Sequence, residues 1–308
     1  METTLMHPTY LPFTEEQVLA HVAAVTGGGP ADPRAYLAHF EKALEAHRRA
    51  TAVASLPRQR DVAAPPAAIA HDERFWTATA LLSVLHGPSP VEDLAAVLTR
   101  AYGEVPPFAG FASWAEALGT DPELWLEVGM PSPSSYQHHL RGELPRHVLS
   151  WAEVRAGRAK VKLEGATRVD AVVVSPSTGV AVVVEAKVRS DLSTSTTYDV
   201  RRNQLARLVD VTLDAHPALA QDSLRHRRPD RTCVLLLTPE VFRDDPASRL
   251  YGHLHASYTQ RPETLAAHLP HRSEPLVHEA ARRLGWATWE DVERVRPGAL
   301  PWRVPGAR

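Results

Sequence analysis

The sequence predicts an α/β protein whose central sheet mixes parallel and antiparallel strands. Short Val-rich runs separated by turn residues occupy 159–188, which is the pattern of three successive strands. A helical stripe of apolar residues follows over 205–213, and a continuous apolar run over 231–242 is typical of a buried strand. With one or two helices expected over 131–158, the core reads helix, three strands, helix, strand.

Helices are expected on both sides of this core. Before residue 120, apolar residues recur at helical spacing in stretches that open with Thr, Pro, Ser or Asp. Near the other end, "EPLVHEAARRLGWATWEDVERV" predicts a terminal helix pair in which Trp286 and Trp289 pack. The chain is accordingly divided into a mainly helical N-terminal region (1–130), a core (131–245) and a helical C-terminal extension (246–308).

The composition is that of an ordinary globular protein. Hydrophobic residues make up 44% and charged residues 23% of the 308 positions, so a sizeable core is available. No stretch of eighteen uninterrupted apolar residues occurs, so no membrane span is expected. The first residues lack a signal-peptide pattern, and Cys233 as the single cysteine excludes an internal disulfide and a cysteine cluster for zinc. We therefore expect a cytoplasmic protein without membrane partners.

The distribution of charge is more informative than its total of −2. Between Arg141 and Thr232 there are 16 Lys and Arg against 11 Asp and Glu. A nearly neutral chain with one basic segment is typical of a protein that meets a polyanion through one face. Random unevenness of the charges is the alternative.

The runs "RVDAVVVS" and "GVAVVVEAKV" predict a β-hairpin with charged residues at its open end. If the turn comprises Pro176 to Gly179, Ser175 pairs with Val180 and Asp170 lies opposite Glu185. Opposed residues on neighbouring strands project to one face at roughly 5 Å between Cβ atoms. Lys187 shares that face because strand side chains alternate. This register depends on a four-residue loop.

Two adjacent carboxylates repel each other and do not stay ionised together unaided. A divalent cation between Asp170 and Glu185 would remove the conflict, and oxygen ligands of this kind suit Mg²⁺ or Mn²⁺. The backbone carbonyl of Ala186 is expected near the same edge. Such a metal polarises a phosphoryl oxygen and lowers the pKa of a bound water, while an adjacent Lys187 can orient that water. The pattern therefore indicates phosphodiester hydrolysis.

An Asp, a hairpin-length gap and then Glu-x-Lys on the next strand resembles the PD-(D/E)XK nuclease superfamily, over roughly residues 134–240. The resemblance implies a restriction-endonuclease-like fold with an αβββαβ core, and a Mg²⁺-dependent nuclease acting on nucleic acid, with DNA favoured over RNA. Asp170, Glu185 and the Ala186 carbonyl would bind the metal, Lys187 would position the attacking water, and Gln204 on the following helix would support the site. The products would carry a 5′-phosphate and a 3′-hydroxyl.

Further candidates surround this set. Some members of the superfamily contribute an acid from the first helix, which here would be Glu143 or Glu153, and Glu164 is expected at a strand end near Asp170. For each of the three, a solvated surface carboxylate is the favoured alternative. Phosphate contacts are expected from a group of arginines on and after the later helix: Arg201, Arg202, Arg207, Arg225, Arg227, Arg228 and Arg231.

Two alternatives stay open at this point. A non-catalytic module that binds nucleic acid or protein would keep the same fold without cutting. In an unrelated sheet protein, Asp170 and Lys187 would form a cross-strand salt bridge with no affinity for metal. The sequence is compatible with a homodimer and does not decide between endonuclease and exonuclease action.

Overall fold

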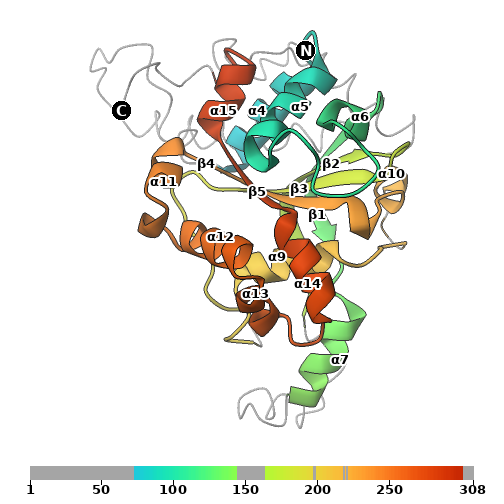
Figure 1. Ribbon diagram of the computed structural model, residues 1–308, viewed down its shortest axis with the longest axis vertical. Coiled ribbons are helices and arrows are strands. Elements are labelled where there is room, and N and C mark those ends of the chain that lie inside the picture. The colour runs from blue at the N-terminus through green and yellow to red at the C-terminus, as the bar shows by residue number, and fades with distance from the viewer. Residues whose placement is uncertain (1–72, 144–163, 197–198, 218, 220, 301–308) are drawn as a thin grey trace, which may run out of the picture.

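A five-stranded mixed sheet forms the centre of the computed structural model, which describes residues 73–143, 164–196, 199–217, 219 and 221–300 (Figure 1). The strands follow one another across the sheet in chain order. The first three pair antiparallel, and β3, β4 and β5 pair parallel, so the predicted α/β class with a mixed sheet is confirmed. The strands are β1 (Glu123–Met130), β2 (Thr167–Ser175), β3 (Val180–Ala186), β4 (Thr232–Thr238) and β5 (Leu284–Thr288).

The hairpin of β2 and β3 has the predicted register. Ser175 pairs with Val180, and the pairing continues to Ala171 and Val184. The backbone N–H of Gly179 donates to the Ser175 carbonyl at 2.8 Å, and Gly179 adopts a φ of 72°, a conformation that glycine reaches without a steric penalty. The four-residue turn therefore fixes which residues of the two strands face each other.

The first strand of the sheet is not the one that the sequence predicted. β1 precedes helix α7 (Ser134–Glu143) and lies in the segment expected to be mainly helical. Of the predicted strand at 159–165, residues 159–163 lie outside the described residues, and Glu164 and Gly165 belong to no strand. The alternation that marks a strand changes phase within β1, since Leu124 and Leu126 pack on one face of the sheet and Val128 and Met130 on the other.

The prediction of a terminal helix pair was wrong for its first half. The residues Leu284–Thr288 form β5, which pairs parallel with β4, and only Trp289–Val295 form a helix, α15. Burial decides this, because all five residues of β5 are buried between the two helical layers. The sheet thus takes β1 and β5 from outside the segment 131–245.

Helices cover both faces of the sheet (Figure 1). On one face, α4, α5, α6 and α15 pack over side chains such as Val182, Val184 and Leu235. On the other, α9 and α12 to α14 pack over Val183, Leu236 and Trp286. The remaining bounds are α4 (Glu73–Leu85), α5 (Pro90–Tyr102), α6 (Trp114–Leu118), α9 (Gln204–Thr212), α10 (Asp222–Arg225), α11 (Glu240–Asp244), α12 (Leu250–Gln260), α13 (Pro262–His268) and α14 (Glu274–Arg282).

Helices α4 and α5 confirm the two helical patterns nearest the core, and the earlier ones lie outside the described residues. The predicted apolar stripe of α9 is also confirmed, with Leu205, Leu208 and Val209 buried. The side chain of Asn203 caps this helix by accepting the Ala206 N–H, which fixes Gln204 as its first residue. Within the described ranges no helix is both long and apolar enough to cross a membrane.

Candidate active site

Where the backbone pairing of β2 and β3 ends, the side chain of Asp170 accepts a backbone N–H of β3 in place of a backbone carbonyl. Backbone pairing between β2 and β3 is regular up to Ala171 and Val184. One step further, Oδ2 of Asp170 accepts a hydrogen bond from the Ala186 N–H at 2.7 Å. The carboxylate is thereby tied to the strand that carries Glu185 and Lys187, as the predicted register requires.

Glu185 and Lys187 form a buried ion pair at the end of β3. The Lys187 Nζ donates to Oε1 of Glu185 at 2.6 Å and to the Ala186 carbonyl at 3.1 Å. The lysine backbone is held on two sides, because its N–H donates to the Leu237 carbonyl of β4 and its carbonyl accepts the indole N–H of Trp289. Side chains on such a rigid frame hold a defined geometry.

Gln204 reaches the same group from α9. Its Nε2 donates to Oε1 of Glu185 at 2.7 Å, and its Oε1 accepts the Ser193 N–H at 3.0 Å. The Gln204 backbone N–H also donates to the Ser193 carbonyl, so the loop after β3 holds both the backbone and the side-chain oxygen of Gln204. The structure therefore brings together Asp170, Glu185, Lys187 and Gln204, the four side chains that the sequence proposed.

Burial and mutual repulsion act against ionisation of the two acids. Burial, followed by the nearby charge of Glu185, raises the pKa of Asp170 to about 7. Burial also raises the pKa of Glu185, although Lys187 opposes the shift. Burial alone would lower the pKa of Lys187, but the Glu185 carboxylate reverses this and raises it, so the lysine stays charged. Two neighbouring carboxylates with raised pKa values beside one ammonium group are typical of a functional site and would be stabilised as carboxylates by a divalent cation.

The oxygen atoms of this group fit a divalent cation that takes few ligands from protein. The hydrogen bonds described above use Oδ2 of Asp170 and Oε1 of Glu185. Oδ1 of Asp170, Oε2 of Glu185 and the Ala186 carbonyl are therefore the oxygen atoms that could bind a cation. Across the described part of the chain, no group of three or more His, Cys, Asp and Glu side chains is arranged to hold a metal. Mg²⁺ commonly binds one or two carboxylates and completes its shell with water and phosphate oxygens.

Sequence reasoning missed Glu73, the first residue of α4. Its Oε1 accepts the Val188 N–H at 3.1 Å, and its Oε2 lies 3.7 Å from the Lys187 Nζ. The acidic side chain that a helix places next to Lys187 is therefore Glu73 of α4, which precedes β3 by more than a hundred residues. No local pattern signals such a contact, because only the packing of α4 on the sheet creates it.

Glu127 of β1 is the second residue that was missed. It lies between the pairs Leu126–Ala171 and Val128–Val169, which places it opposite Asp170. Its φ of 53° is in the left-handed region, the one positive value at a non-glycine position among the described residues. Its charge contributes to the raised pKa values of Asp170 and Glu185. The sequence of β1 gives no signal of this, because apolar residues continue in regular alternation from Leu124 to Met130 although the face on which they pack changes.

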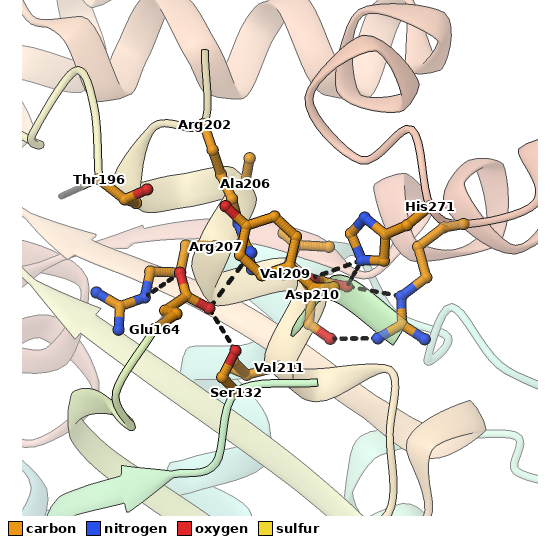
Figure 2. Close-up of polar contacts among 12 residues, drawn as sticks. Ser132, Glu164, Thr196, Arg202, Ala206, Arg207, Val209, Asp210, Val211 and His271 are labelled. Carbon is orange, nitrogen blue, oxygen red and sulfur yellow. Dashed lines mark hydrogen bonds and ion pairs between the residues drawn. The ribbon is translucent and has the colours of Figure 1, made fainter. Parts of the chain in front are cut away.

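Of the other candidate acids, Glu164 faces away from the pair. It is buried, accepts the Ser132 hydroxyl, and lies 3.3 Å from the Arg202 Nη1 and 3.1 Å from the Arg207 Nε (Figure 2). Glu143, at the end of α7, lies 3.7 Å from the Arg201 Nη2. Glu153 lies outside the described residues. Neither described acid has a contact with Asp170 or Glu185.

Arg202 and Arg227 are internal residues, which corrects their assignment to a nucleic-acid surface. Arg202 is fully buried, bridges Glu164 and Asp210, and lies over the Tyr136 ring at 3.5 Å (Figure 2). Arg227 donates to the carbonyls of Thr212 and Asp214, and burial lowers its pKa to about 10. Guanidinium groups committed in this way cannot reach phosphate.

The remaining predicted arginines do not surround the carboxylates. The Arg228 N–H donates to the Gly179 carbonyl and the Arg231 side chain to that of Thr178, so both lie at the hairpin turn, the opposite end of β3 from Glu185. Arg225, which lies on α10, pairs with Asp222. Arg201 pairs with Glu143 and Asp199, and Arg207 with Glu164. The basic segment of the sequence is therefore spread over both ends of the sheet.

Comparison with known proteins identifies no relative: no family model, no curated protein and no solved structure matches the chain. The chemistry of the site has to be inferred from its own geometry.

Proposed function

We propose that this protein is a metal-dependent nuclease of the PD-(D/E)XK type, which hydrolyses phosphodiester bonds in nucleic acid, DNA in preference to RNA. One observation carries the proposal: Asp170 is hydrogen-bonded to the strand on which Glu185 and Lys187 form a buried ion pair of 2.6 Å. Buried ionisable groups cost stability, and the buried Glu185 and Lys187 next to a partly buried Asp170 mark a functional site better than a structural one.

The order of the elements supports the finer fold assignment. With α4 taken as the first helix, and α5, α6 and α10 counted as additions to the core, the chain passes through β1, β2, β3, α9 and β4, which is the αβββαβ order of a restriction-endonuclease-like core. Helix α7 is then an insertion between β1 and β2. The acid from the first helix, expected in some members, is Glu73 in this arrangement.

Each residue of the site has a distinct role in the proposed reaction. Asp170, Glu185 and the Ala186 carbonyl would hold Mg²⁺ or Mn²⁺. When bound, the metal supplies positive charge for the phosphoryl oxygens and lowers the pKa of a water ligand. Lys187 is protonated, so it donates hydrogen bonds to the attacking water or the phosphate and does not act as a base. The water gives a proton to solvent as its oxygen bonds to phosphorus, the P–O3′ bond breaks, and the leaving oxygen takes a proton from solvent to become the 3′-hydroxyl.

A cleavage assay on three substrates tests the proposal. The full chain is incubated with supercoiled plasmid, single-stranded DNA and RNA in Mg²⁺ or Mn²⁺, with EDTA as the metal-free control. We expect cutting of DNA that stops in EDTA and in Lys187→Met, whose side chain keeps the length without the charge. Folding of the variant is checked by circular dichroism. A folded native chain that cuts none of the substrates, or a folded variant that cuts as fast as the native chain, would refute the proposal.

Gln204 is predicted to act by orienting Glu185. In Gln204→Leu the 2.7 Å hydrogen bond to Oε1 of Glu185 is lost while the volume is kept. We expect the cleavage rate to fall by about 10- to 100-fold, the usual cost of removing a partner that orients a metal ligand. A shift of the Mn²⁺ dependence to higher concentration should accompany the fall. An unchanged metal dependence would show that Gln204 has no part in orienting the ligand.

A further inference from the structure

In both β1 and β2, the regular alternation of side chains between the two faces of the sheet is interrupted at the candidate site. In β1, Leu126 packs on one face of the sheet and Val128 on the other. In β2, Ala171 and Val169 are divided in the same way. Residues two positions apart on a regular strand share a face. The alternation is therefore interrupted at the residue that lies between the two named positions of each strand. Those two middle residues are Glu127 and Asp170.

The strained backbone of Glu127 directs its carboxylate to two arginines. Oε2 lies 3.2 Å from the Arg168 Nη1, and Oε1 lies 3.5 Å from the Arg74 Nε. The glutamate side chain is only 10% exposed, whereas Arg74 is 50% and Arg168 69% exposed. A non-glycine residue with positive φ persists only where its surroundings require it, and such residues concentrate at functional sites. The strain here serves to anchor two outward-facing guanidinium groups.

This pair of arginines flanks the catalytic carboxylates. Arg168 precedes Asp170 by two residues on β2, and Arg74 follows Glu73, which contacts Lys187. Both guanidinium groups remain at least half exposed while they pair with Glu127. Glu127, which lies opposite Asp170 in the sheet, is therefore the residue that ties both arginines to this part of the molecule.

We propose that Arg74 and Arg168, anchored by Glu127, bind phosphates of the nucleic-acid strand beside the bond to be cut. This rests on the proposed nuclease function and adds to it the surface that positions the substrate. Guanidinium groups suit the task, since their planar N–H donors match phosphate oxygens in pairs. The contacts are to the backbone, so they contribute affinity and orientation and no sequence preference.

The test is the binding of a short labelled DNA duplex to the full chain in Ca²⁺, at several salt concentrations. The double variant Arg74→Ala/Arg168→Ala should bind more weakly than the native chain. Its plot of log affinity against log salt should be shallower by about one unit for each arginine removed. In the cleavage assay the KM should rise more than the kcat falls. Melting temperatures confirm that these surface changes leave the fold intact.

Arg282→Ala is the matched control. Arg282 is 72% exposed, pairs with a single acid, Glu279, and lies just before β5, at the end of the sheet away from the carboxylates. We expect native binding and cleavage from this variant. The arginine proposal is overturned if the native chain cuts DNA but the double variant keeps the native affinity and salt slope. It is equally overturned if Arg282→Ala loses as much. A native chain that neither binds nor cuts would instead refute the nuclease function.

Discussion

Replacing Asp170 with asparagine is expected to abolish DNA cleavage while the protein stays as stable as the native chain, or becomes more stable. Asparagine keeps the shape and the oxygen that accepts the Ala186 N–H, and it removes a buried charge beside Glu185. Loss of a metal ligand removes several kcal/mol of transition-state stabilisation, which corresponds to a fall in rate of about 10³-fold or more. A structural salt bridge would behave in the opposite way, because its loss would lower stability.

The pH dependence of stability should also show that the ionised carboxylate of Asp170, which the proposed reaction requires, destabilises the fold. Burial and the nearby Glu185 raise the pKa of Asp170 from its ordinary value of 3.8 to about 7 in the folded chain, so between these values the folded chain holds the proton more tightly than the unfolded chain. Its contribution therefore favours folding at low pH, and is lost as the pH rises from about 4 to about 7. In Asp170→Asn this loss is absent.

Thermal unfolding in EDTA at about pH 5 and about pH 8 measures the difference. We expect the melting temperature of Asp170→Asn to exceed that of the native chain by more at the higher pH. Added Mn²⁺ should raise the melting temperature of the native chain and leave that of the variant unchanged. A variant that is less stable than the native chain at both pH values would contradict the assignment of Asp170 to a metal site.

Of the substitutions described, Asp210→Ala is expected to cause the largest decrease in the free energy of unfolding. Asp210 on α9 is completely buried and lies 2.7 Å from the Arg202 Nη2, 2.7 Å from the Arg272 Nε and 3.0 Å from the His271 Nε2 (Figure 2). Burial would raise its pKa, but the His271 hydrogen bond and the two arginines outweigh burial and lower it. Removing the carboxylate leaves Arg202 with Glu164 and Arg272 with Asp214 as their remaining acids, so the buried guanidinium charge is only partly compensated, at a cost of up to about 3–5 kcal/mol.

Urea unfolding at neutral pH measures this cost. The control is Asp222→Ala, which removes an exposed acid paired only with Arg225, and should unfold near the native midpoint. Because the pKa of Asp210 is lowered, its contribution is present at neutral pH and is lost as the pH falls through its folded pKa. The native chain should therefore lose its advantage over Asp210→Ala in acid. Equal midpoints for the native chain and Asp210→Ala at neutral pH would show that the network does not stabilise the fold.

The geometry around Asp170 and Glu185 was predictable because it depends on a local feature. A four-residue turn with glycine at its last position fixes the register of β2 and β3, and strand alternation then places Lys187 beside Glu185. Gln204 was proposed from the resemblance to the nuclease superfamily, and the cap by Asn203 makes it the first residue of α9. Short-range rules suffice where few residues separate the partners.

Glu73 and Glu127 were not predictable in this way. Glu73 approaches Lys187 only because α4 packs over the sheet, a contact between distant parts of the chain. Glu127 depends on a left-handed backbone that propensity rules assign to glycine. The arginines failed for a different reason: a count of charges along the chain does not distinguish Arg202, which is fully buried, from Arg168, which is exposed. Burial of charged groups is a tertiary property.

Plasmid cleavage at increasing Mn²⁺ concentration, measured side by side for the native chain and Asp170→Asn, tests whether Asp170 and Glu185 hold a cation that phosphodiester cleavage requires. We predict that the native chain converts supercoiled DNA to nicked or linear forms at a rate that rises with Mn²⁺ and saturates, while the folded variant does not cut at any concentration. Equal cutting by both proteins, or cutting by the native chain that persists in EDTA, would contradict this mechanism.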